Sequence, residues 1–289
     1  MSSRRPGGTV PAVSTAEASP GALLRDWRRR RRLSQLDLAL EAGVSARHVS
    51  FLETGRSRPS REMVLHLSEQ LDIPLRDRNH MLLAAGFAPA YAERAIDAPE
   101  MAPVREALDR ILKGHEPYPA VVVDRWWDLA AANAGVALLT SMVAPHLLEP
   151  PANALRITLH PDGMAPHVRN LPEWRAHLLD RLRRQVAVTG DQRLAALQAE
   201  LAGYPGGEAT LPAHEPGIAV PLELDAGGTE LSFFSTISTF GTAVDITLAE
   251  LAIEAFFPAD EQTGAYVRSA TMPSSSARAG SGSASNRTA

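Results

Sequence analysis

A chain of 289 residues, of which 45% are hydrophobic, is long enough for two domains with ordinary globular cores. It contains no cysteine, which excludes disulfide bonds and thiolate metal sites. It also has no apolar run of about 18 residues and no hydrophobic signal sequence at its start, so we expect a cytoplasmic protein without membrane insertion.

Charge is distributed unevenly along the chain. The first 62 residues carry about +6, so the other 227 carry about −10 to give the formal net charge of −4. A basic segment joined to an acidic one is typical of a DNA-binding module fused to a part that avoids DNA. Residues 1–18 and 269–289 are rich in serine, glycine, alanine and proline, and we expect them to be disordered tails.

A five-helix bundle is predicted over residues 19–90. Its first helix runs from Leu23 to Arg31 and turns Leu24 and Trp27 inward. Four arginines of this helix are predicted to face outward, and they are Arg25, Arg28, Arg29 and Arg32.

The second predicted helix follows Ser34, whose side chain can form a capping box with Asp37. The spacing of its apolar residues predicts a buried face, made of Leu36, Ala39 and Leu40. Gly43 can adopt a positive φ and is predicted to end this helix.

The third predicted helix follows Ser45, its N-cap, and buries Val49 and Leu52. Four other side chains of its first turns face outward, where a recognition helix contacts base edges in the major groove. They are Ala46, Arg47, His48 and Ser50. Capped helix pairs and solvated arginine runs also occur in all-α proteins that do not bind DNA. The two caps, the Leu-Glu-x-Gly-x-x-x-Pro exit and the charge distribution together favour DNA binding.

The segment SQLDLALEAGVSARHVSFLETGRSRPS resembles the helix-turn-helix domain of the Cro and phage-repressor (XRE-like) class. The resemblance implies binding to double-stranded DNA. It implies phosphate contacts from Gln35 and Ser45 and base contacts from Ala46, Arg47, His48 and Phe51. Arg47 is the strongest candidate, because a guanidinium can donate two hydrogen bonds to one guanine. Arg56 and Arg58 lie in the following loop and are predicted to contact the DNA backbone without sequence preference.

Two further helices complete the predicted bundle. The fourth is capped by Ser60, and the fifth runs from about Arg76 to Ala85. The proline-containing segment that follows is predicted to pack on the bundle through Phe87 and Tyr91. Residues 91–114 are then a linker and a connecting helix, which runs from Met101 to Lys113.

The second domain is predicted over residues 115–268, with an α+β fold. A β-branched run at Val121–Val123, a tight Asp124-Arg125 turn and a second run through Leu129 predict a hairpin. Asn133 is then predicted to start a helix.

Two later helices and three apolar runs complete this domain. The helices are predicted near 171–188, with Trp174, Leu178 and Leu182 on one side, and near 193–201. The apolar runs lie near 218–224, 231–237 and 244–248 and are separated by glycine turn signals. The simplest arrangement of these elements is an antiparallel sheet that helices cover on one face.

Three segments of the chain resemble the MmyB-like regulators, in which a repressor-type head is joined to a PAS-like ligand-binding domain. They are VVVDRWWDLAAANAGVALL, NALRITLHPDGMAPHVRNLPEWR and LSFFSTISTFGTAVDITLAELAIEAFFP. The resemblance covers about residues 20–260 and implies a transcription regulator whose pocket takes a small apolar ligand, with a fatty acid as the candidate. Bulky side chains are predicted to line this pocket, although a place in the plain core is the alternative for each. They are Trp126, Trp127, Leu129, Met142, Met164, Phe233 and Phe240.

Two alternatives stay open at this point. His160, Asp162 and His167 lie within eight residues and could bind a metal or act as acid and base. The His-Pro-Asp-Gly stretch is also an ordinary turn, and common catalytic signatures are missing from the sequence, so we expect neither an enzyme nor a metal site. In the other alternative, the second domain is only a dimerisation or protein-interaction module without a ligand. Repressor-type heads read two half-sites as two-fold dimers, so we expect a homodimer on a two-part operator.

Overall fold

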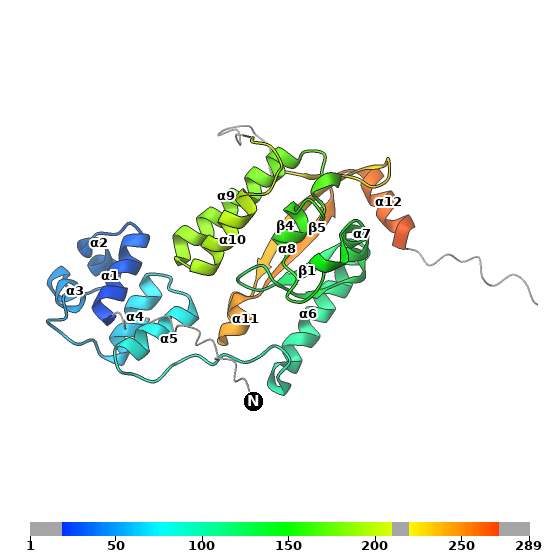
Figure 1. Ribbon diagram of the computed structural model, residues 1–289. Helices are drawn as coiled ribbons and strands as arrows, with labels where there is room; N and C mark the ends of the chain where they lie inside the picture. Colours follow the sequence, from blue (N-terminus) through cyan, green and yellow to red (C-terminus); the bar gives the residue numbers. More distant parts are fainter. Residues whose placement is uncertain (1–18, 210–219, 272–289) are drawn as a thin grey trace, which may run out of the picture. The chain divides into compact units, whose positions relative to one another are not determined.

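The computed structural model describes residues 19–209 and 220–271 (Figure 1). One compact unit comprises the residues up to Glu93 together with Val244–Ile246, and the other comprises Arg94–Ala243 and the residues from Thr247 onward. The predicted tail 1–18 and most of the predicted tail 269–289 lie outside the described residues. The second tail was predicted to begin too early, because the last described helix continues to Thr271. No helix in the described ranges is long and apolar enough to cross a membrane.

Five helices form the first unit, as predicted. They are α1 (Pro20–Arg30), α2 (Gln35–Glu41), α3 (Ala46–Glu53), α4 (Arg61–Gln70) and α5 (Leu75–Ala84). Serine side chains cap α2, α3 and α4, and Ser34 and Asp37 form the predicted capping box. Gly43 has a φ of 63° in the turn between α2 and α3, a conformation that glycine adopts without strain. Local hydrogen bonds therefore fix where these helices begin and end.

The predicted buried face of α2 is correct for Ala39 and wrong for Leu36 and Leu40. Leu38 and Ala39 are buried, whereas Leu36 is 58% exposed and Leu40 is 72% exposed. Apolar residues occupy four of the seven positions of α2, so their spacing does not select one face. Packing with the rest of the unit selects the face that carries Leu38.

The predicted orientation of Arg28 in α1 is also wrong. Leu24 and Trp27 are buried as expected, but Arg28 is only 8% exposed. Its guanidinium donates to Glu53 of α3, from Nε to Oε1 at 2.6 Å and from Nη2 to Oε2 at 3.0 Å. A buried guanidinium requires such a partner, and the partner lies 25 residues away in the sequence.

The segment after α5 packs on the first unit through both predicted residues. Phe87 lies against the core, and the backbone oxygen of Tyr91 accepts a hydrogen bond from Asn79 Nδ2 at 2.8 Å. The side chain of Asn79 also accepts from the backbone N–H groups of Ala90 and Tyr91.

The second unit is an α+β fold built on one antiparallel sheet. Its strands are β1 (Ala120–Val123), β2 (Leu129–Ala132), β3 (Leu222–Asp225), β4 (Glu230–Thr239) and β5 (Ala252–Pro258). Their order in the sheet is β2-β1-β5-β4-β3, so the last strand in sequence lies at the centre. Its helices are α6 (Ala102–His115), α7 (Ala137–Thr140), α8 (Ala154–Leu159), α9 (Leu171–Thr189), α10 (Gln192–Ala202), α12 (Glu261–Thr271) and, except for its first residue, α11 (Ile246–Glu250). Its described residues also form short 3₁₀ helices at Pro99–Met101, Ala134–Val136, Pro145–Leu147 and Ala165–His167.

One predicted strand is wrong. The run near 244–248 contains α11, and the strand that closes the sheet is β5. Leu248, Ala249 and Glu250 favour a helix, whereas β5 contains aromatic and β-branched residues.

Helices contact both faces of the sheet, which corrects the prediction of one covered face. Residues of α9 and α10 share a core with one face of β1, β3 and β4. On the other face, Leu108 and Leu112 of α6 pack with Val122 and Ile253. Figure 1 shows α6 and the pair α9–α10 on either side of the strands.

The hairpin of β1 and β2 has a longer turn than predicted. The backbone N–H of Asp124 donates to the oxygen of Asp128 at 2.9 Å, and Trp126 and Trp127 lie between them rather than in the second strand. The side chain of Asp124 accepts from the backbone N–H groups of Trp126 and Asp128, which stabilises this turn. Asn133, which was predicted to start a helix, precedes a 3₁₀ turn, and its side chain bonds to three backbone groups instead of capping it.

Candidate nucleic-acid interface and ligand cavity

The surface of α3 presents the residues that were predicted to read DNA. Ser45 is its N-cap, since Oγ accepts a hydrogen bond from the N–H of His48 at 3.1 Å. Arg47 is exposed, and Ala46, His48 and Ser50 are half-buried. Val49 and Leu52 are buried on the opposite side, as predicted. The capped helix therefore holds these side chains in fixed relative positions near its N-terminus.

Two arginines gather around one aromatic ring at this surface. The guanidinium carbon of Arg47 lies 5.0 Å from the ring centre of Phe51, and that of Arg56 lies 5.8 Å from it. Arg56 and Arg58 are exposed. Within the described residues, no carboxylate forms an ion pair with any of these three arginines. Described carboxylates therefore do not neutralise these charges, and the Phe51 ring limits the conformations of Arg47 and Arg56.

Beneath this surface, a buried carboxylate connects three helices. The side chain of Glu53 on α3 is 0% exposed and accepts from Arg28 of α1. It also accepts from Gln35 Nε2 of α2 at 2.8 Å, and Arg25 Nη2 donates to its backbone oxygen at 2.9 Å. One N–H of the Gln35 side-chain amide therefore donates to Glu53. The second N–H of this amide can still donate to a phosphate, as predicted.

The charge state of Glu53 follows from these contacts. Burial raises the pKa of Glu53, but hydrogen bonds from Arg28 and Gln35 more than offset this and bring it below its ordinary value. The hydrogen bond to Glu53 in turn raises the pKa of Arg28. The pair is therefore an ion pair that fixes α3 relative to α1 and α2.

An apolar cavity lies inside the second unit. Its volume is about 60 Å³, and its walls come from the sheet, from α7 and α8 and from the first half of α9. Apolar wall residues include Val121, Leu139, Ile157, Leu178, Leu222 and Phe256. Polar side-chain atoms on the wall belong to Thr140, Thr158, Glu254 and Trp174, and the buried Nε1 of Trp174 has no hydrogen-bond partner among the described residues. Such a lining suits an apolar molecule held by a few polar contacts.

The predicted pocket residues fall into three groups. Leu129 and Met164 are on the cavity wall. Trp126, Trp127, Met142 and Phe233 belong to or pack against the surrounding core without lining the cavity. Phe240 packs with the α6 cluster, on the other side of the sheet. Phe233 lies on β4 and Phe240 directly follows it, at an odd number of positions from Phe233, and neighbouring residues of a strand face opposite sides of the sheet.

One charged residue on the cavity wall was missed by sequence reasoning. The side chain of Glu254 on β5 is 8% exposed. Its Oε1 accepts from Arg181 Nη1 of α9 at 3.2 Å and from Ser235 Oγ of β4 at 3.1 Å. Arg181 also lies over the ring of Trp127, with its guanidinium carbon 4.1 Å from the ring centre. Burial lowers the pKa of Arg181, and Glu254 partly reverses this shift. The sequence signal that could have identified Glu254 is its position as the single acidic residue in the apolar run 251–257.

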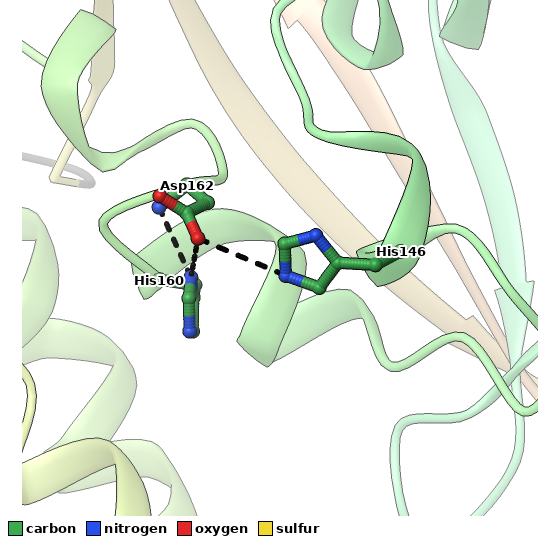
Figure 2. Close-up of side chains that lie close together, drawn as sticks. All are labelled: His146, His160 and Asp162. Carbon is green, nitrogen blue, oxygen red and sulfur yellow. Dashed lines mark hydrogen bonds and ion pairs between the residues drawn. The ribbon is translucent and has the colours of Figure 1, made fainter.

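Two histidines and an aspartate form a separate group on the surface, shown in Figure 2. Oδ2 of Asp162 lies 3.8 Å from His146 Nε2 and 3.9 Å from His160 Nδ1. His146 takes the place of the predicted His167 in this group. Such donors could hold a transition metal. However, His160 Nδ1 already accepts the backbone N–H of Asp162, and the N–H of Gly163 bonds to the oxygen of His160 as in an ordinary turn.

Comparisons with known proteins agree with this arrangement. A helix-turn-helix family model matches residues 24–77, so the first unit is of the class found in DNA-binding transcription regulators. A second model, described as the MmyB-like transcription regulator ligand binding domain, matches residues 104–270, which is more than half of the chain. The chain belongs to this family of MmyB-like transcription regulators, as the sequence predicted.

Similarity to individual proteins is more limited. The crystal structure of the clp gene regulator ClgR from Corynebacterium glutamicum is similar at 26% sequence identity, over 35% of this chain and 94% of that chain. Its TM-score of 0.21 is too low to support a structural conclusion. No curated protein matches the chain.

Proposed function

We propose that this regulator reads a specific operator by inserting α3 into the major groove. In this proposal Arg47 donates two hydrogen bonds to a guanine, and Ala46, His48 and Ser50 lie near the neighbouring base edges. Gln35, Ser45, Arg56 and Arg58 bind phosphates. The observation that carries the proposal is the exposed Arg47 on the first turn of α3, a helix that the buried ion pair of Glu53 with Arg28 attaches to α1.

Substitution of Arg47 tests this assignment. Duplexes selected from a random pool by the full chain define the operator, and fluorescence anisotropy then measures binding. Arg47→Ala is expected to weaken operator binding by about 1–3 kcal/mol and to relax one base position. Arg183→Ala, which removes an exposed arginine of the second unit, is the control. If discrimination between operator and mutated operator survives Arg47→Ala unchanged, α3 does not read bases through Arg47.

For the second unit, we propose a PAS-like sensor whose cavity takes the hydrocarbon part of a small, fatty-acid-like ligand. The apolar lining and the family match support this function. A cavity of about 60 Å³ is smaller than the usual range for ligand sites, roughly 300–1,000 Å³. A long chain would therefore have to enlarge the cavity. That change could be transmitted to DNA binding, provided that the ligand has different affinities for the DNA-competent and incompetent states.

We further propose that the chain binds a two-part operator as a homodimer. Helix-turn-helix heads of this type read half-sites related by two-fold symmetry, which supports a dimer. The alternative is a second unit that only dimerises or binds another protein. A third possibility is an enzymatic role. Among the described residues, the observation in its favour is the surface group of His146, His160 and Asp162.

Native mass spectrometry of the purified full chain separates these possibilities. A dimer with a bound mass of fatty-acid size, lost on denaturation, is the expected result. An empty dimer that also binds no added apolar compound would favour the interaction module. A monomer that stays a monomer on operator DNA would contradict the homodimer.

A further inference from the structure

Three side chains that can ligate a metal come together on the second unit from two segments of the chain. His146 lies in the 3₁₀ helix Pro145–Leu147, and His160 and Asp162 lie in the turn after α8. Figure 2 shows both histidine rings beside one oxygen of Asp162, which is 3.8 Å from His146 Nε2 and 3.9 Å from His160 Nδ1. One donor atom from each side chain lies within 4.8 Å of the other two. His146 thus joins the other two residues only in the folded chain.

Backbone contacts hold the two segments in place. The N–H of Ala144 donates to the backbone oxygen of Asp162 at 2.9 Å, which places the start of the 3₁₀ helix beside the turn. Within the turn, the N–H of Gly163 donates to the backbone oxygen of His160 at 2.8 Å. The rings of Tyr204 and His160 meet edge to face with 5.0 Å between their centres, which limits the orientations of His160. Both segments and one of the rings are therefore positioned by contacts within the protein.

The charge and the protonation of these groups favour a cation. Among the residues that the structure describes, no arginine or lysine forms an ion pair with the Asp162 carboxylate. The side chains of Asp162 and His146 are 60% and 56% exposed, so an ion can reach them from solvent. His160 Nδ1 accepts the backbone N–H of Asp162 at 3.0 Å, so it is the unprotonated nitrogen of that ring. An unprotonated imidazole nitrogen is the form that binds a metal.

We propose that His146, His160 and Asp162 bind one divalent transition-metal ion of the Zn²⁺ class. Nitrogen and carboxylate ligands lie about 2.0–2.2 Å from a tetrahedral Zn²⁺, which places them roughly 3.4 Å from one another. Movements of about an ångström in exposed side chains are enough to reach this geometry. On binding, His160 Nδ1 exchanges the N–H of Asp162 for the ion, and water occupies the remaining coordination position. Two imidazoles favour such an ion over Mg²⁺ or Ca²⁺, which prefer oxygen ligands.

This site goes beyond the proposed function, and it lies next to segments that enclose the cavity. Leu139 of α7 and Ile157 of α8 are both on the cavity wall. His146 follows α7 along the chain, and His160 is the C-cap residue of α8. An ion bound to both histidines connects the chain beyond one helix to the end of the other. It therefore limits their relative movement and stiffens this side of the cavity.

Zinc titration of the full chain without an affinity tag tests the proposal. The protein is treated with EDTA, exchanged into a buffer that does not bind metals and titrated with Zn²⁺ in a calorimeter. We expect one ion to bind per chain, to raise the melting temperature and to slow hydrogen exchange in residues 141–148 and 159–163. Mg²⁺ is expected to bind at least tenfold more weakly. Absence of zinc binding, or equal affinities for Zn²⁺ and Mg²⁺, would overturn the proposal.

Substitution of His146 assigns zinc binding to this group. His146→Ala removes an exposed ligand and leaves the turn unchanged, so it should weaken Zn²⁺ binding at least tenfold without a change in circular dichroism. Asp162→Asn keeps the backbone N–H that donates to His160 and should weaken Zn²⁺ binding to a similar extent. His167→Ala is the matched control, because His167 lies in the same stretch of sequence but outside the group. Zinc affinity that is unchanged in His146→Ala and Asp162→Asn, or that falls equally in His167→Ala, would contradict the site.

Discussion

Removal of the Glu53 carboxylate is expected to destabilise the first unit more than any surface change. Glu53→Ala leaves the guanidinium of Arg28 buried without its ion-pair partner, and Gln35 without its acceptor. Breaking a buried pair from one side costs about 3–5 kcal/mol. For a unit of this size, each kcal/mol corresponds to about 4–8 °C, so the melting temperature should fall by roughly 12 °C or more.

Calorimetry of the full chain measures this loss, and hydrogen exchange by mass spectrometry assigns it to α1, α2 and α3. Glu41→Ala, at an exposed position on α2, is the control and should change little. The Arg28→Met, Glu53→Met double variant should recover much of the stability, because no unpaired charge remains. A loss below about 1 kcal/mol in Glu53→Ala would refute the claim that this ion pair holds the helices together.

The same pair gives the stability a defined dependence on pH. The pKa of Glu53 is lower in the folded state than its ordinary value, so its contribution is fully present above the unfolded-state pKa. It is lost as the pH falls through the lower, folded-state pKa. The unfolding free energy of the wild type should therefore fall more steeply with decreasing pH than that of the Arg28→Met, Glu53→Met variant. Equal slopes of the unfolding free energy against pH would contradict a contribution of Glu53 to acid sensitivity.

The remaining predictions concern DNA affinity and helix geometry. Arg58→Ala should weaken binding to all sequences alike and reduce the salt slope by about one, measured by anisotropy at several salt concentrations; an effect on one sequence alone would indicate a base contact. Gly21→Ala places a Cβ 2.3 Å from the backbone oxygen of Leu52 and should lower the unfolding free energy by about 1–3 kcal/mol in calorimetry. Gly114→Ala, where a Cβ meets nothing within 4 Å, should be neutral or stabilising, and equal effects of the two would contradict the close approach of α1 and α3. Ser34→Ala removes the cap of α2 and should cost about 1 kcal/mol in chemical unfolding, a loss that Ser34→Asp should largely avoid.

Much of the first unit could be predicted from the sequence because its signals are local. The caps at Ser34, Ser45 and Ser60 bond to backbone N–H groups three residues later, so contiguous residues encode them. The turn at Gly43 depends on the φ of one residue. The two family resemblances could also be recognised from the sequence, because they rest on continuous segments of it.

Pairings between distant residues could not be predicted in this way. Glu254 and Arg181 lie 73 residues apart, and neither has a neighbour in sequence that identifies the other. The cavity likewise depends on which residues of β1, β5 and α9 face one another, and only two of the predicted lining residues reach it.

The sequence by itself determined the kind of protein: a capped helix-turn-helix head with an outward Arg47, followed by an α+β domain of the MmyB-like type. Only the tertiary structure decided that Arg28 turns inward, that Leu36 and Leu40 stay exposed, and that Glu254 lies on the cavity wall. The physical reason is the range of the interactions. Caps and turns are closed by hydrogen bonds within one helical turn, whereas burial and charge pairing depend on surfaces that meet only when the whole unit has folded.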